Sequence, residues 1–374
     1  MQGMAIRTNS AAQGRVVMDE LQASLRDWGL SDAVSIHPSE PLVGHPGWQV
    51  RATLTEQAFS AWTPHFDTLG LCARLGLDIA HRAHELELKI AIELLAAPRL
   101  MSYPNLEEWR SAIRMRCAIV DAARHARVAF ATQDAERPAQ FWNWDEEMGW
   151  RLNPGVDLVE ALEHTIRPGP NGPLWSFSCY RVTEHVLLLG LARELREVNA
   201  KLYETLQHSC RHEAIRSEAF VGAFLEEYGS TAAPLPAGYY VPGDRVWFRN
   251  PDERSSNVTG YEGSWVIYLG EGLFSNFWKE QAPYSLQDKC VEIFHWRDAV
   301  VNAKSGDPTM DENLVEKLVQ QTRNDPRREA AVLARMMRWR DPQGVYAQGG
   351  CLDRSREHLR RVHPGSADLD IPLH

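Results

Sequence analysis

Apolar residues in the first part of the chain recur mostly three or four positions apart, which is the spacing of helices with one buried face. This spacing predicts six helical stretches, at residues 16–28, 67–97, 107–127, 159–166, 213–228 and from about 173 to about 206. Residues 48–54 are expected to be extended, and the prolines of residues 98–105 are expected to break the second helix. The N-terminal part is therefore predicted to be mainly helical.

The pattern changes after residue 234, where prolines and glycine punctuate the chain. Short apolar segments separated by turn residues predict antiparallel strands at 245–249, 263–269, 273–278 and 290–296. Alternating aromatic residues around a turn predict a hairpin over 141–154. Helices return after residue 305, at 314–322 and 327–339, and the residues after 341 are expected to be weakly ordered. Helices followed by a cluster of strands predict an α+β fold.

The expected elements divide the chain into three segments. Residues 1–100 form a mainly helical N-terminal extension, residues 101–305 a core, and residues 306–374 a helical C-terminal segment with a basic tail. Arginines concentrate in this last segment, and a solvated helix face with a loose tail is the simplest interpretation. For the extension, a regulatory cap, a targeting module and part of a toxin-like effector remain open alternatives.

Charge and composition exclude some classes of function. Forty Lys and Arg against fifty Asp and Glu give a net charge of -10, which disfavours nucleic acid as a partner. No stretch approaches the roughly 18 apolar residues of a membrane span. The first residues lack the apolar region of a secretory signal, so a cytoplasmic protein is expected, with delivery as a secreted effector left open. The six scattered cysteines predict free thiols in a reducing compartment.

One of these cysteines stands apart because of where it lies. Residues 171–179 read NGPLWSFSC and open a long apolar run, and the Asn-Gly-Pro start is typical of a helix N-terminus. Cys179 is therefore expected in the early turns of a buried helix, where the helix dipole stabilises a thiolate. This placement is similar to that of the nucleophile in papain-like enzymes.

A cysteine nucleophile needs a group that takes and returns its proton. The strand region offers Glu262, whose aromatic neighbours Tyr261 and Trp265 predict an apolar setting that raises the pKa of its carboxyl group. His295 is the rival base. Two histidine-containing runs, HRAHE and HSCRH, lack the ligand pattern of a zinc site, so no metal is expected.

Several motifs in order give a more specific indication. They are RMRCAIVDAARHARVAFAT, FWNW leading to NPG, NGPLWSFSC, PGDRVWFRNPD and YEGSWVIYLGEG. With this spacing, residues 109–278 resemble the small bacterial protein-glutamine γ-glutamyltransferases, the spore-associated transglutaminase family. The resemblance implies a papain-like (NlpC-like) core, in which the nucleophile lies on a central helix packed on a small antiparallel sheet.

The resemblance also implies roles for individual residues. Cys179 corresponds to the family nucleophile and Glu262 to its proton acceptor. Ser178 stands where the family often has a second glutamate, and Asn276 aligns loosely with a family histidine; with His295 they are auxiliary candidates. Trp175, Trp265 and Trp278 are expected to wall a hydrophobic substrate tunnel.

The implied activity is the formation of isopeptide cross-links between protein glutamine and lysine through a cysteine thioester. Its partners are two protein substrates, a glutamine donor and a lysine acceptor, and it needs no cofactor. Attack by water in place of lysine gives deamidation. Two alternatives remain open: a papain-like glutamine deamidase or peptidase, possible also as an effector toxin, and an inactive interaction module on the same fold.

Overall fold

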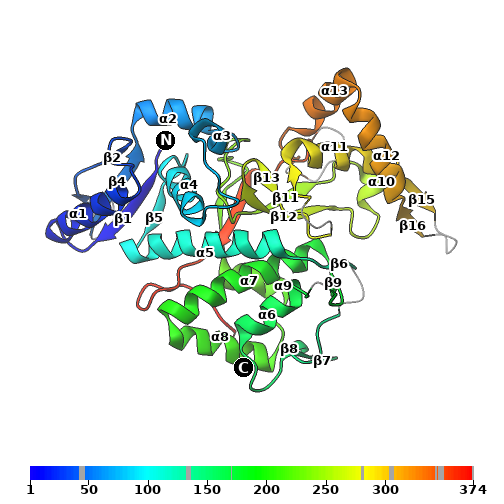
Figure 1. The fold of residues 1–374 in the computed structure, drawn as a ribbon, viewed down its shortest axis with the longest axis horizontal. Coiled ribbons are helices and arrows are strands. Elements are labelled where there is room, and N and C mark those ends of the chain that lie inside the picture. Colours follow the sequence, from blue (N-terminus) through cyan, green and yellow to red (C-terminus); the bar gives the residue numbers. More distant parts are fainter. Residues whose placement is uncertain are drawn as a thin grey trace.

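The computed structural model describes residues 1–41, 47–131, 136–169, 171–278, 282–302, 307–341, 343 and 349–372, and its fold mixes helices and sheets. Two long helices, α5 (Leu106–His125) and α7 (Cys179–Val198), lie side by side in the middle of the molecule (Figure 1). Their close approach depends on Gly190 of α7, because a Cβ atom there would lie 2.6 Å from Cγ1 of Ile119 on α5.

Further helices and hairpins surround this pair. The helix α6 (Leu158–Ile166) packs on α7. The helix α8 (Ala200–His212) follows α7 in the chain after a break at Asn199. The predicted hairpin is confirmed as β7 (Trp142–Asp145) and β8 (Gly149–Leu152). The single helix expected from about 173 to about 206 begins later, at Cys179, and is two helices. Asn199 ends α7, and its side chain caps α8 by accepting from the Leu202 N–H.

The N-terminal residues build a small sheet flanked by helices, which differs from the mainly helical segment expected. Its strands are β1 (Met4–Thr8), β2 (Val34–Ile36), β3 (Glu40–Pro41), β4 (Trp48–Leu54) and β5 (Met101–Tyr103). The extended segment at 48–54 and the first helix, α1 (Ala11–Asp27), are confirmed. The other strands were missed because they are too short to show a period of two, and β1 is buried along most of its length.

The long helix predicted over 67–97 is wrong. Residues 67–97 contain two separate helices, α3 (Leu71–Leu75) and α4 (Ala83–Leu95). The helix α2 (Glu56–Trp62) and the 3-10 turn Pro64–Phe66 precede them. Gly76 adopts a left-handed conformation with φ 66°, and its N–H donates to the carbonyl of Cys72. A glycine in this conformation commonly ends a helix. The helical spacing of apolar residues continues past Gly76, and for this reason the sequence pattern did not reveal the break.

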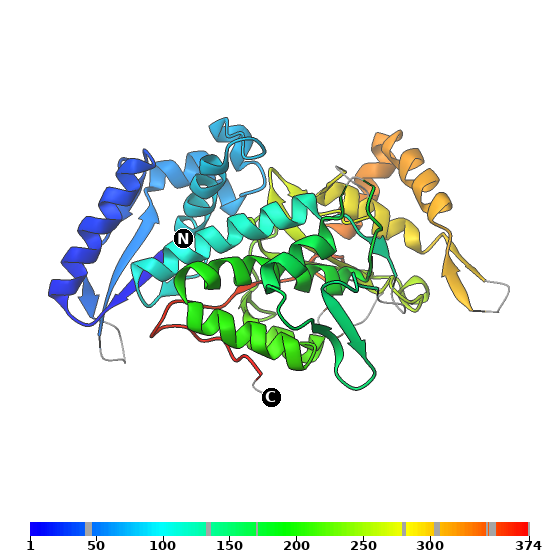
Figure 2. The same cartoon turned by 60° about the horizontal axis from the view of Figure 1, so that its bottom comes forward.

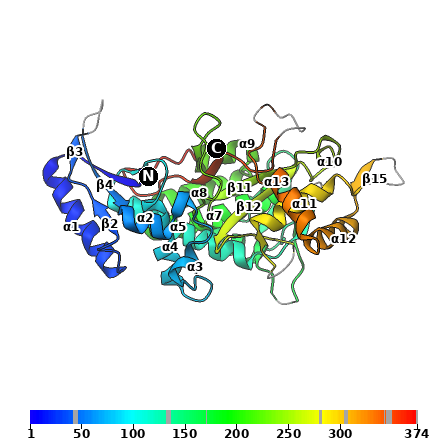
Figure 3. The same ribbon diagram turned by 90° about the horizontal axis from the view of Figure 1, so that it is seen from above.

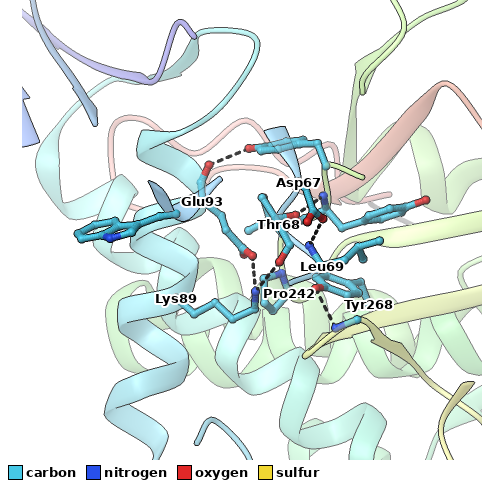
Figure 4. A network of polar contacts seen from close by, with 12 residues as sticks. Asp67, Thr68, Leu69, Lys89, Glu93, Pro242 and Tyr268 are labelled. Atoms are coloured by element: carbon cyan, nitrogen blue, oxygen red, sulfur yellow. Dashed lines mark hydrogen bonds and ion pairs between the residues drawn. The ribbon is translucent and has the colours of Figure 1, made fainter. Parts of the chain in front are cut away.

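A buried polar network ties the N-terminal residues to the rest of the chain (Figure 4). Lys89 and Glu93 of α4 form a fully buried ion pair, and the Lys89 ammonium also donates to the Thr68 carbonyl over 3.2 Å. The Thr68 hydroxyl donates over 2.7 Å to the carbonyl of Tyr240, and the Tyr239 hydroxyl donates over 2.9 Å to the carbonyl of Glu93. Buried contacts therefore cross the boundary expected at residue 100, which stays a prediction.

The sheet beside α7 is antiparallel throughout the described residues. Its order is β10 (Leu225–Gly229), β17 (Ser355–Leu359), β11 (Arg245–Arg249), β12 (Gly263–Gly270), β13 (Leu273–Phe274) and β14 (Tyr284–Ser285). The strands predicted at 245–249 and 263–269 are confirmed. The strand predicted at 273–278 is shorter, and the helix predicted at 213–228 is the shorter α9 (Ser217–Phe224) followed by β10.

The strand predicted at 290–296 is wrong, because these residues belong to the helix α11 (Leu286–Trp296). Ser285 and Asp288 form a capping box at its start, and buried residues recur at helical spacing along it. Two predicted helices, α12 (Glu312–Arg323) and α13 (Pro326–Met336), pack against α11 and are confirmed. Seen from above, these three helices lie at the opposite end of the molecule from the N-terminal sheet (Figure 3).

Short elements complete the chain: β6 (Ala129–Phe130), β9 (Ser176–Phe177), α10 (Glu253–Ser256), β15 (Val300–Asn302) and β16 (Pro308–Met310). The boundary expected between residues 305 and 306, and Thr132 at the end of the first quoted motif, lie outside the described residues. No helix in the described part of the chain has the length and apolar character that crossing a bilayer requires.

Two of the motifs quoted from the sequence meet in the interior. Arg116, from the helix motif RMRC, lies with its Nη1 atom 2.8 Å from Oδ1 of Asp244, from the turn motif PGD. Both side chains are buried, and Asp244 also accepts from the Val241 N–H and from the Tyr228 hydroxyl. The ion pair fixes the turn before β11 against α5.

The C-terminal tail is ordered, contrary to the sequence-based expectation. The strand β17 lies between β10 and β11 and pairs with both, and Leu352 and Arg356 are buried. Beyond it, the carbonyl of Val362 accepts from the Asn199 side chain at 2.8 Å, where the red trace runs along the green helices (Figure 2). Nearby, Arg361 is paired with Asp368. The local pattern of apolar and polar residues could not reveal this strand, because its partner strands lie more than 100 positions earlier in the chain.

This arrangement predicts that the tail is needed for stability. Ending the chain at residue 348 removes β17 and exposes the edges of β10 and β11, and each buried leucine or valine lost is worth about 1.5–3 kcal/mol. We expect Leu352→Ala alone to cost about 2–5 kcal/mol in urea denaturation. The matched control is Leu174→Ala, at a leucine that is 43% exposed. Equal denaturation midpoints for the two variants would contradict the structural role of the tail.

Candidate active site

Cys179 is the first residue of α7, so it lies in the first turn of a helix as expected. The helix does not begin at the Asn-Gly-Pro sequence, because Ser176 and Phe177 form the strand β9 before it. Ser178 is the N-cap: its hydroxyl accepts from the N–H of Arg181 at 3.3 Å, which is a common way to begin a helix. The preceding strand β9 pairs in parallel with β6, and this pairing fixes the direction in which the chain enters the helix. The auxiliary candidate Ser178 thus has a structural role in placing Cys179.

Cys179 lies on a cavity of ≈ 720 Å³ between the start of β12, the loop after β13 and the helices α11 and α12. The side chains that line it include Phe130, Tyr261, Trp278, Tyr284, Lys289 and Trp296. Asn276 also lines it; its amide donates to the Ala282 carbonyl at 2.9 Å, and its Oδ1 atom accepts from the Trp278 N–H at 3.3 Å. Two predicted site residues, Asn276 and Trp278, are therefore brought together with Cys179.

The other two tryptophans of the predicted tunnel lie elsewhere. Trp265 stacks on Trp247 with ring centroids 5.7 Å apart, and the guanidinium of Arg245 lies 4.5 Å from the Trp265 ring. Trp175 packs against the core around α7, and its carbonyl accepts from the Ala129 N–H at 2.9 Å. Among the described residues, the lining of the Cys179 cavity includes neither ring. Each ring fills space beside the site, although both are close to it in sequence.

Electrostatics at Cys179 favour a protonated thiol at rest. Burial raises the pKa of this thiol, and the Glu262 carboxylate adds to the rise. The backbone N–H of Trp265, the Lys289 ammonium and the N–H of Tyr180 lower the same pKa but do not offset burial. The helix start therefore does not by itself yield the thiolate expected from the sequence, and Cys179 needs a base.

Glu262 directly precedes β12, between two residues that line the cavity, Tyr261 and Gly263. Its side chain is exposed, and its Oε1 atom accepts from the N–H of Gly260 at 3.3 Å. The apolar enclosure predicted for this carboxylate is therefore wrong: Tyr261 packs on Trp296 and Trp265 stacks on Trp247, while Glu262 is exposed. No hydrogen bond of the described residues joins Glu262 to Cys179.

His295 is held away from the cavity. Its ring is buried on α11, with Nε2 2.7 Å from the Thr322 hydroxyl and Nδ1 3.2 Å from the Asp298 carboxylate. Burial lowers the pKa of His295, and the ring is not among the side chains that line the Cys179 cavity. These contacts give His295 a role in joining α11 to α12.

Lys289 is a residue of this cavity that the sequence analysis missed. It lies in the first turn of α11 and is buried, with Nζ 3.1 Å from Oε2 of Glu292 and 3.6 Å from the centroid of the Tyr284 ring. Because residues 290–296 were predicted to form a strand, Lys289 was not expected to lie on a helix beside the cavity. The signal was present, because Ser285 and Asp288 form a capping box and Lys289 and Glu292 are one helical turn apart.

A second cavity, of ≈ 500 Å³, has Ser178 in its lining. It is lined by the hairpin residues Trp144 and Trp150 and by Glu184 of α7, among others. Burial raises the pKa of Glu184 to about 7. Neighbouring residues, Ser178 and Cys179, therefore line two different cavities.

Metal ligation finds no support within the described ranges, where no group of three His, Cys, Asp or Glu side chains could hold an ion. In the HSCRH run, the rings of His208 and His212 pack against each other 4.0 Å apart. All six cysteines are described and free, as the sequence predicts.

Comparisons with known proteins agree with the motifs. A family model described as protein-glutamine gamma-glutamyltransferase matches residues 75–346, a range that contains Cys179, Glu262 and α11. A curated protein-glutamine gamma-glutamyltransferase of Halalkalibacterium halodurans is 20% identical over 192 residues, covering 50% of this chain and 62% of the relative. A solved transglutaminase from Geobacillus stearothermophilus, without its C-terminal extension, is 20% identical with a TM-score of 0.39, over 58% of this chain and 98% of that one. The match thus spans less than two thirds of the curated relative's length.

Proposed function

This chain belongs to the protein-glutamine gamma-glutamyltransferase family, and on that premise we propose that it joins protein glutamine and lysine side chains through isopeptide bonds. The observation that carries the proposal is the position of Cys179, at the start of α7 and on a cavity whose lining includes the residues on both sides of Glu262. The proposed nucleophile thus lies on the cavity, and the proposed base lies between two residues that line it.

The reaction proceeds in two halves. The Cys179 sulfur attacks the γ-carboxamide carbon of a glutamine while Glu262 takes the thiol proton, and that proton leaves with ammonia as the thioester forms. A lysine amine then attacks the thioester carbon, gives its proton to Glu262, and releases the thiol with the same proton. The N–H groups of Trp265 and Tyr180, which already lower the pKa of Cys179, are suitable donors for the negatively charged intermediate.

The fold supports this assignment. The nucleophile helix α7 packs on β12 of an antiparallel sheet, the arrangement of a papain-like (NlpC-like) core. We propose that residues 101–305 form this catalytic core, with the N-terminal residues 1–100 and the C-terminal residues 306–374 as additions. A cytoplasmic location and the exclusion of nucleic acid stay predictions from the sequence.

The exposure of Glu262 favours a second candidate, glutamine deamidation. Water can reach this carboxylate, and water activated by it would hydrolyse the same thioester to a glutamate side chain. The two functions share every step up to the thioester and differ only in its acceptor.

One assay separates them. The wild-type protein is incubated with a casein-like glutamine donor, with and without a labelled primary amine, and both incorporated label and released ammonia are measured. We expect label in the donor and ammonia in proportion to it. Ammonia release that the amine does not change, with no label, would indicate the deamidase, and neither product would leave an interaction module on this fold.

A further inference from the structure

Lys289 is a buried cation on the wall of the cavity that holds Cys179. Only 3% of the residue is exposed, and its ammonium has partners inside the protein. The Glu292 carboxylate lies 3.1 Å away, and the face of the Tyr284 ring lies 3.6 Å away. Burying an ammonium is costly without such partners, so the position is built to hold a positive charge.

The charge of Lys289 is stable over the working range. Burial lowers the pKa of its ammonium, but Glu292 and Tyr284 outweigh burial, and the pKa lies above its ordinary value. Lys289 therefore stays protonated at neutral pH. A protonated amine has no lone pair, so Lys289 cannot itself accept the acyl group from Cys179.

The start of α11 is held by a capping box and by an ion pair with α12. The Ser285 hydroxyl accepts from the N–H of Asp288 at 3.0 Å and donates to the Asp288 carboxylate at 2.6 Å. The same carboxylate forms an ion pair with Arg323 near the end of α12. Lys289 therefore projects from a turn whose backbone is held in place before any substrate binds.

Other charged groups around Cys179 are less suited to act on its sulfur. The cavity also carries Asp288, Glu292, Glu312, Glu316 and Lys317, with the phenols of Tyr261 and Tyr284. Glu312 accepts from the Tyr261 hydroxyl, and Glu312, Glu316 and Lys317 are exposed to solvent, which screens their charges. Arg181 and Glu184 line the second cavity and pair with each other, and Glu262 is exposed. Lys289 is the buried cation in this set.

We propose that Lys289 stabilises the Cys179 thiolate across this cavity, as a preorganised positive charge that offsets the cost of burying the sulfur anion. The inference rests on the proposed function only in taking Cys179 as the nucleophile. In agreement with it, Lys289 lowers the pKa of the Cys179 thiol against the effect of burial. Glu262 then removes the proton, and Lys289 makes the resulting anion less costly.

The test measures the thiol directly. Iodoacetamide alkylation of Cys179 is followed from pH 6 to pH 10 by mass spectrometry of its peptide, because only the thiolate reacts. We expect Lys289→Met to raise the apparent pKa by about one unit, which slows alkylation about tenfold at each pH below the pKa of the wild-type thiol. Lys289→Arg should keep a profile close to that of wild type, because it keeps the charge.

The matched control is Lys317→Met, which removes an exposed lysine from α12 and should move the profile by much less. An unshifted profile in folded Lys289→Met would overturn the proposal, as would an equal shift in Lys289→Arg or Lys317→Met. If Lys289→Met does not fold, Lys289→Gln, which keeps a donor for Glu292, is measured in its place with the same criterion. Alkylation needs no glutamine or lysine substrate, so this result and the amine-incorporation result can fail separately.

Discussion

Cys179→Ala is expected to abolish both amine incorporation and ammonia release while leaving the protein folded. In the proposed mechanism the thioester forms on this sulfur, and removing the nucleophile of a catalytic unit can cost on the order of 10⁶ in kcat. The substitution removes one atom from a partly buried residue at the start of α7, where Ser178 and not Cys179 provides the cap. Label incorporation at high enzyme concentration, together with circular dichroism, measures the two parts of this expectation.

The other cysteines provide matched controls for this result. Cys117 is partly buried on α5, and burial raises the pKa of its thiol to about 12, so it is a poor nucleophile. Cys117→Ser, and the corresponding variants at Cys72, Cys210, Cys290 and Cys351, should retain turnover. Cys290 and Cys351 have their sulfur atoms 3.2 Å apart in the interior, so their replacement is expected to affect stability first. A folded Cys179→Ala with substantial turnover would refute the mechanism.

Glu262→Gln is expected to reduce turnover by about 10²–10⁴-fold, the usual contribution of a general acid or base, with little change in stability. The carboxylate is exposed, and its contact within the described residues is with the nearby Gly260 N–H, which an amide oxygen can also accept. Because Cys179 is protonated at rest, loss of the base should be most severe near neutral pH and should weaken as pH rises toward the pKa of the thiol. A pH–rate profile of the variant measures this.

Two further variants make the assignment of the base specific. Glu253→Gln is the matched control, because it makes the same change at an exposed glutamate on the helix α10. It should leave turnover within about twofold of wild type. His295→Ala should lower stability, because it leaves a cavity and an unpartnered Thr322 hydroxyl between α11 and α12. If Glu262→Gln is as active as wild type while folded His295→Ala is inactive, the base has been misassigned.

Much of the candidate site could be read from the chain because its signals are local. A helix start is encoded within a few residues, so the motif at 171–179 placed Cys179 in the first turns of a helix, although α7 begins six residues after the Asn-Gly-Pro sequence. The motif around Glu262 likewise predicted the strand β12, and both positions lie within the range that the family model matches. In contrast, the pKa of Cys179 depends on burial and on Lys289, about 110 positions later, and no local pattern contains that information.

The sequence by itself determined the α+β class, most of the helices, the nucleophile motif and the family. The tertiary structure alone decided that residues 290–296 form part of α11, that β17 enters the sheet from the far end of the chain, and that Glu262 is exposed while Lys289 is buried. The physical reason is the range of the interactions involved. Helix periods and caps arise between residues three or four positions apart, whereas strand pairing, burial and the electrostatics of a cavity arise between residues that only the folded chain brings together.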